Sequence, residues 1–205
     1  MRIIQKNQKM KSKTMEKRII FIFIFSLVLF CLMKTSVNAS TLSELTLKDL
    51  CDNSSDIVIA EVISRVSYLK KDEKRIYTTI KIHITEKLKG EITASEEISL
   101  KVIGGSVDGI TTLVIGAPSF NVGEKSILFL NKIVAKNGDK NYVVTGLSQG
   151  KFNIFSDSES KTDKVVRDHF GIPLKPEKDI SPLFINDKES IQIQEFLDFV
   201  IKYIK

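Results

Sequence analysis

The chain has 205 residues, 42% of them hydrophobic, and a formal net charge of +6, which leaves room for one domain. Eight of its 31 Lys and Arg residues and one of its 25 Asp and Glu residues lie in positions 1–39, so positions 40–205 hold 23 basic and 24 acidic residues. The positive charge therefore belongs to the N-terminus. The nearly neutral remainder argues against nucleic-acid binding.

Positions 1–39 are typical of an export signal. A basic stretch precedes fifteen apolar residues at 19–33, and Val37 and Ala39 occupy the −3 and −1 positions of a small-residue cleavage site. Cleavage after Ala39 predicts an exported protein, periplasmic or secreted, with no stable membrane span. Fifteen apolar residues are fewer than the roughly 20 that cross a bilayer, which favours a cleaved signal. An uncleaved single-pass anchor is the alternative.

Cleavage leaves Cys51 as the one cysteine of the chain. A single cysteine cannot form an internal disulfide, and it argues against a zinc–thiolate site. Thr46 and Asp49 match a capping box, which predicts a short helix with Leu47, Leu50 and Cys51 on one face. Cys51 is therefore predicted to be a core residue, with a reactive thiol as the alternative.

Long apolar or alternating segments follow. Strict alternation from residue 76 predicts a half-buried strand that points Ile76, Thr78, Ile80, Ile82 and Ile84 to one side. Segments 56–69, 97–105, 125–134 and 142–155 complete the set, and the apolar faces of 125–134 suit a strand covered on both sides. The predicted fold is mainly β: a partly open five-stranded antiparallel OB-like barrel.

The C-terminal part has a different character. Segment 156–163 is a polar loop, and Pro-punctuated chain follows it. Apolar residues then recur at helical spacing, which predicts an amphipathic helix with Ser190 as its N-cap. The helix is expected to cover an open face of the sheet; a partner-binding or membrane helix is the alternative. The predicted domains are 1–39 (signal peptide), 40–155 (barrel) and 156–205 (loop and capping helix).

Motifs for chemistry are not found in this sequence. It contains no HExxH, GxSxG or CxxC pattern, and Glu124 stands where a phosphate-binding loop would need glycine. Asp157, Glu159 and Asp163 lack the central glycine of a calcium loop. We therefore predict no catalytic residue, no metal and no cofactor. A small secreted hydrolase that uses His169 or His83 is the alternative.

The most informative stretch is 104–123, which holds five of the ten glycines. Pro118 fixes its own φ and pushes the preceding residue toward extended geometry. Phe120 is either an anchor inside the barrel or an exposed apolar knob. An exposed Phe120 would support a binding loop, and a buried one would count strongly against it. The candidate partner-binding residues are Gly104, Gly105, Asp108, Gly109, Pro118, Ser119, Phe120 and Asn121.

Three segments carry a family resemblance: "SDIVIAEV" (55–62), "IHITEKLKG" (82–90) and "FNVGEKSILF" (120–129). In this order the sequence resembles a netrin-like domain of the tissue-inhibitor-of-metalloproteinases type, in a version like that of small exported bacterial proteins. The resemblance covers most of 55–155 and implies an OB-fold barrel whose loops meet a protein partner, a protease being one candidate. Ser40 stands where those inhibitors have a zinc-chelating cysteine, so their chelating mechanism does not carry over.

Together these patterns predict an exported, non-catalytic binding module. It would present the 104–123 segment to a protein partner in the envelope or outside the cell. The alternatives are the small hydrolase and a purely structural envelope protein.

Overall fold

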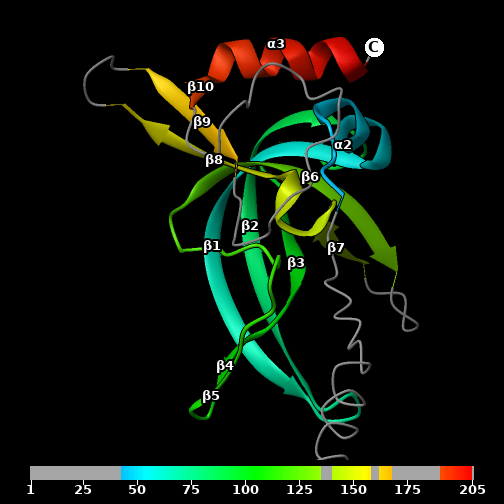
Figure 1. Ribbon diagram of the computed structural model, residues 1–205, viewed down its shortest axis with the longest axis vertical. Helices are drawn as coiled ribbons and strands as arrows, with labels where there is room; N and C mark the ends of the chain where they lie inside the picture. The colour runs from blue at the N-terminus through cyan, green and yellow to red at the C-terminus, as the bar shows by residue number, and fades with distance from the viewer. Residues whose placement is uncertain (1–42, 135–139, 158–161, 168–189, 205) are drawn as a thin grey trace, which may run out of the picture. The chain divides into compact units, whose positions relative to one another are not determined.

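The computed structural model describes residues 43–134, 140–157, 162–167 and 190–204. The chain divides into two compact units, Met1–Ser40 and Thr41–Lys205, and the described residues belong to the second. Their elements, drawn in Figure 1, are α2 (Leu47–Asn53), β1 (Asp56–Lys70), β2 (Arg75–Lys89), β3 (Glu97–Ile103), β4 (Gly105–Val107), β5 (Ile110–Thr112), β6 (Lys125–Val134), β7 (Lys140–Val144), the 3₁₀ helix η1 (Leu147–Gly150), β8 (Lys151–Ser156), β9 (Asp163–Arg167), β10 (Ile191–Gln192) and α3 (Ile193–Ile204).

Five strands form the partly open barrel that the sequence predicts. They follow one another in the order β1-β2-β3-β7-β6, and β6 pairs back with β1. The pairs β1–β2, β2–β3, β6–β7 and β1–β6 are antiparallel. The β3–β7 pair is parallel and has one register pair, Leu100 with Tyr142. This parallel junction is an exception to the antiparallel pairing that we expected, and the barrel is open beside it.

The barrel interior is filled by the inward faces of its strands. All five residues predicted to point inward from β2, Ile76 through Ile84 at every second position, are buried. β6 contributes to two cores because its faces alternate. Leu128 and Leu130 point into the barrel, whereas Ile127 and Phe129 pack on its outer side. The prediction that this strand is covered on both faces is confirmed.

The second core lies between the outer face of the barrel and the two helices. Phe152 of β8 packs against Phe196 of α3 with 4.7 Å between ring centroids, and Cys51 of α2 belongs to the same cluster. The C-terminal helix therefore covers a sheet face as predicted. Ser190 is not its N-cap, because β10 lies between Ser190 and the first helical residue, Ile193.

Other local predictions can be checked against the structure. The capping box of α2 is present: Asp49 N donates to Thr46 Oγ1 at 3.1 Å, and Thr46 N donates to Asp49 Oδ2 at 2.9 Å. Strand β9 was not predicted; it continues the sheet beyond β8. The Asn137–Gly138 pair, a dipeptide typical of hairpin turns, lies outside the described residues. Neither described helix is long and apolar enough to cross a membrane.

Candidate functional site

The 104–123 segment begins with a small hairpin of β4 and β5. Asp108 and Gly109 form its turn with φ of 49° and 78°, the positive values that an Asp-Gly hairpin turn takes. Glycine at position 109 permits this reversal, but the two strands of the hairpin were not predicted. Both turn residues are exposed at its tip.

Gly105 brings β4 against the ribbon of β1 and β2. Its φ is +131°, and an added Cβ would lie 2.3 Å from Thr78 Oγ1 and 2.5 Å from Ser67 Oγ. Those two hydroxyls are hydrogen-bonded at 2.9 Å, and Thr78 Oγ1 also donates to Gly104 O at 2.7 Å. Glycine is therefore required at this position by close approach as well as by conformation.

For Phe120 the structure decides between the two alternatives that the sequence left open. Its side chain is 3% exposed and belongs to the barrel core, so it is an anchor and not an exposed hot-spot residue. The backbone at the same position is also held, because Arg65 Nη1 donates to Phe120 O at 3.0 Å. Phe120 can therefore no longer count as a partner-binding residue, and its burial counts strongly against a binding loop that uses this side chain.

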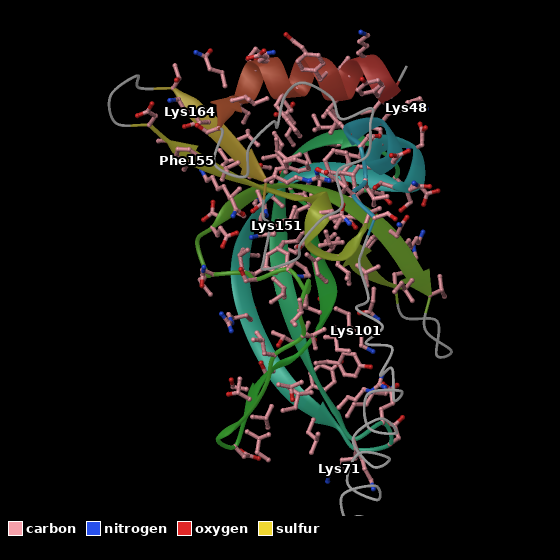
Figure 2. The ribbon with its side chains drawn as sticks, viewed as in Figure 1. Lys48, Lys71, Lys101, Lys151, Phe155 and Lys164 are labelled. Atoms are coloured by element: carbon pink, nitrogen blue, oxygen red, sulfur yellow. The ribbon has the colours of Figure 1, made fainter. Side chains whose placement is uncertain are left out.

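A buried ion pair fixes the end of the segment. Lys151, the first residue of β8, is fully buried, with Nζ 2.5 Å from Glu124 Oε1 (Figure 2). The Lys151 ammonium also lies 4.9 Å from the centroid of the Phe120 ring, within the range of a cation–π contact. Glu124 Oε2 accepts from Asn121 N at 3.0 Å. Glu124 stands where a phosphate-binding loop would need glycine. Its contacts with Lys151 and Asn121 hold this turn in place.

Five of the eight candidate residues line one cavity of about 210 Å³: Gly104, Gly105, Pro118, Ser119 and Phe120. Its lining also includes the apolar residues Ile80, Val102 and Leu113, together with Arg65 and several residues that carry hydroxyl groups. Asp108, Gly109 and Asn121 do not line the cavity. The structure therefore brings together most, but not all, of the residues that the sequence singled out.

Four large apolar side chains of the segment project outward, and none of them was a candidate. Leu113 and Ile115 are 73% and 71% exposed, the highest values among the large hydrophobic residues of the described chain. Ile110 and Val122 are 65% and 62% exposed. The sequence shows that residues 113 and 115 are apolar. No periodic pattern in this irregular segment indicated whether their side chains point inward or outward.

The remaining chemical candidates lie elsewhere. His83 is on the outer face of β2, where Glu61 and Glu97 are its cross-strand neighbours, and it does not line the cavity of about 210 Å³. His169 lies outside the described residues, as does Glu159. Within the described ranges, no group of three or more His, Cys, Asp or Glu side chains could hold a metal ion.

Cys51 matches its prediction as a core residue. It is 1% exposed, and burial raises the pKa of its thiol to about 11. A thiol that stays protonated near neutral pH is a poor nucleophile.

No protein-family model matches this chain, and no curated protein matches it either.

Proposed function

We propose that this protein is an exported, non-catalytic binding module whose 104–123 segment contacts a protein partner in the envelope or outside the cell. The observation that carries the proposal is the outward exposure of Leu113 and Ile115 beside a cavity. We call Ile110, Leu113, Ile115 and Val122 the outer face. Exposed apolar side chains on an anchored segment are a common basis of protein recognition.

The anchoring supports this proposal energetically. Phe120, Glu124 and Lys151 hold the inner side of the segment in one conformation, so less conformational entropy is lost when a partner covers the outer face. The neighbouring cavity of about 210 Å³ can receive one side chain of that partner. The resemblance to netrin-like domains, whose loops meet protein partners, agrees with this role.

A second candidate is favoured by the burial of Phe120. In a purely structural envelope protein, the segment would only close one end of the barrel, and an inward anchor is what closure requires. The two candidates differ in what they demand of the outer face. A binding module needs Leu113 and Ile115 exposed for contact, whereas barrel closure makes no use of them.

The test is site-specific photo-crosslinking of the full chain in the cells that produce it. A benzophenone amino acid replaces Leu113 or Ile115 in two variants, and it replaces Ile201 of α3, which is 42% exposed, in a matched control. We expect crosslinks to one protein from positions 113 and 115 and none to that protein from 201. Identical crosslinking from all three positions, or none, would favour the structural candidate.

A second arm of the test removes the apolar surface itself. Leu113→Ser/Ile115→Ser should abolish co-purification of the crosslinked protein. The control Val66→Ser, at a 63% exposed position of β1, should retain it.

A further inference from the structure

Three barrel strands and the 104–123 segment build the cavity of about 210 Å³. Arg65 comes from β1, Ile80 from β2 and Val102 from β3, and the 104–123 segment supplies most of the remaining lining. The hairpin of β4 and β5 lies beside the β1–β2 ribbon (Figure 1). Leu113 belongs both to the cavity lining and to the outer face. A partner that covers the outer face therefore also reaches this cavity.

Arg65 is the one charged residue in the cavity lining. Its Nη1 donates to Phe120 O at 3.0 Å, and this hydrogen bond fixes the guanidinium. A guanidinium has five N–H donors, and the remaining ones make no hydrogen bond or ion pair with a described residue. The lining includes no Asp or Glu that could balance the charge. A ligand can therefore supply the opposite charge.

The other polar side chains of the lining are hydroxyl groups. Ser106 Oγ and Thr111 Oγ1 lie 2.8 Å apart and share one hydrogen bond. Because each hydroxyl carries one donor, this pair keeps one O–H that can donate to a ligand. Ser119 is exposed and adds another hydroxyl to the lining. The cavity thus offers N–H and O–H donors, which suit a ligand with acceptor oxygens.

Apolar side chains complete the lining. Ile80 and Val102 are buried, and Val114 packs against the barrel core. Contact with these side chains and with Leu113 favours an apolar group in the ligand. The cavity volume of about 210 Å³ is below the roughly 300–1,000 Å³ of typical small-molecule sites. The cavity therefore suits amino-acid side chains better than a cofactor-sized molecule.

The single cation distinguishes between two anionic groups that proteins carry. A carboxylate has one negative charge and can accept two parallel N–H bonds from an arginine. A phosphoryl group carries about −1.5 to −2 charges and is typically recognised by a cluster of arginines. Since Arg65 is the one cation in the lining, its charge matches that of a carboxylate.

We propose that this cavity binds an acidic side chain of the partner together with a neighbouring apolar side chain. The carboxylate pairs with the Arg65 guanidinium, and the apolar side chain contacts Leu113 and Val114. The inference rests on the proposed function, because it names the chemistry that a protein partner presents to the 104–123 segment. It adds Arg65, which was not among the candidate residues, as the group that selects the partner by charge.

The experiment is a selection of random octapeptides, displayed on phage between fixed flanking sequences, against the full chain. Selections against the wild type, Arg65→Gln and Arg65→Glu run in parallel. The matched control is Arg75→Gln, because Arg75 is an exposed arginine of β2 that does not line the cavity. Thermal unfolding of each variant checks that it is folded.

We expect the peptides enriched on the wild type to carry an acidic residue beside a large apolar one. Their affinity should fall by roughly tenfold or more in Arg65→Gln, the loss typical of a hydrogen bond to a charged group, and stay unchanged in Arg75→Gln. Arg65→Glu should enrich peptides with a basic residue in place of the acidic one. Replacing the acidic residue of the peptide by its amide should weaken binding to the wild type but not to Arg65→Gln, because the two changes remove the same contact.

The inference is overturned if no sequence is enriched, if the enriched peptides lack an acidic residue, or if they bind Arg65→Gln as tightly as the wild type. Amidation of the peptide C-terminus should leave the affinity unchanged. A loss on amidation would assign the carboxylate to the chain end and overturn its assignment to a side chain.

None of these measurements uses the crosslinking positions 113 and 115. A failed selection alongside crosslinks from both positions therefore removes this inference alone. Absent crosslinks count against the proposed function, whatever the selection gives.

Discussion

The inner and outer sides of the 104–123 segment are both apolar, yet they have opposite surroundings. Phe120 on the inner side is 3% exposed, while Leu113 and Ile115 on the outer side are 73% and 71% exposed. The inner side contributes to the barrel core and the outer side contributes to no described core cluster. Substitutions within one short segment can therefore test stability and the proposed binding separately.

Phe120→Ala is the change with the largest expected effect on this comparison. Removing a fully buried aromatic ring should lower the free energy of unfolding by about 3–5 kcal/mol. The ring also covers the ammonium of Lys151, 4.9 Å from its centroid. Urea denaturation followed by circular dichroism measures the loss. Val122→Ala, two residues away and 62% exposed, is the control and should change the same quantity by less than about 0.5 kcal/mol. Similar losses in both variants would erase the distinction between the two sides.

Glu124→Gln tests the ion pair that ends the segment. Lys151 is fully buried, and loss of the opposing carboxylate leaves its charge poorly compensated. Breaking such a pair costs about 3–5 kcal/mol; we expect about 3 kcal/mol because Glu124 itself is partly accessible and Lys151 has further contacts. The double variant Glu124→Gln/Lys151→Met should recover most of the loss. If the double variant is less stable than Glu124→Gln alone, the pair is not the source of the effect.

Gly105→Ala examines the close approach of β4 to the β1–β2 ribbon. The added methyl group would meet two hydroxyl oxygens at 2.3 and 2.5 Å in a backbone with φ of +131°, which should cost about 1–3 kcal/mol. Gly109→Ala is a matched control. Its φ is +78°, but no atom lies within 4 Å of the added carbon, so the expected cost is about 1 kcal/mol. Equal losses at the two glycines would show that the positive φ alone, and not the close approach of β4, sets the cost of the substitution.

The strands were predictable because burial imposes a period on the sequence. Ile80, Ile82 and Ile84 are buried as their alternation indicates, and the apolar faces of β6 correctly indicated two cores. A period reports which residues share a face, but not which strand lies next to them. The parallel β3–β7 junction is a long-range choice of partner, and local sequence could not show it.

The candidate site was predicted in part, because the sequence indicates where the backbone turns but not which side chains point inward. The glycines and Pro118 marked where the backbone turns, and five of the candidate residues line a cavity that was not predicted. Phe120 and Leu113 are both apolar residues in an irregular segment, so no periodicity distinguished the inward from the outward side chain. Lys151 was also missed, because lysine is rarely buried without a partner and Glu124 is distant from it in sequence.

The segments that carry the family resemblance contain residues whose hydrogen bonds hold neighbouring elements together. Asp56 Oδ1 accepts from Glu91 N at 2.7 Å and Ile92 N at 3.0 Å. Lys89 Nζ donates to the carbonyl oxygens of Cys51 and Ser54. These contacts fasten the turn after β2 to the start of β1 and the end of α2. Such residues specify a fold, and they carry no information about what the loops bind.

The core between the barrel and the helices contains no residue of the 104–123 segment. It therefore serves as a reference when the inner and outer sides of that segment are compared. Cys51 reports on that core. Burial raises its thiol pKa from 9.0 to about 11, so the unfolded chain loses this proton at a lower pH than the folded one. The stabilising contribution is complete below pH 9 and is lost as the pH rises through 11, so that the loss at pH 11 amounts to about 2 kcal/mol.

Urea denaturation between pH 8 and 11 measures this contribution as the difference between wild type and Cys51→Ala. The wild type should lose about 2 kcal/mol more than the variant over that range. Parallel pH profiles would mean that the thiol is not shielded. The native thiol should also stay unreactive toward Ellman's reagent at pH 8 and react once urea unfolds the chain.

The smallest expected effect is on the outer face, and it decides what that face is for. Leu113→Ser/Ile115→Ser removes two apolar side chains that are already in water, so the free energy of unfolding should change by less than about 0.5 kcal/mol per substitution. The Cys51 thiol should stay as protected as in the wild type. A loss of about 2 kcal/mol or more would mean that Leu113 and Ile115 support the barrel, and it would contradict their assignment to a surface that serves only for binding. An unchanged stability together with a lost crosslinking partner would assign these residues to binding, because the substitutions would then remove the contact without changing the fold.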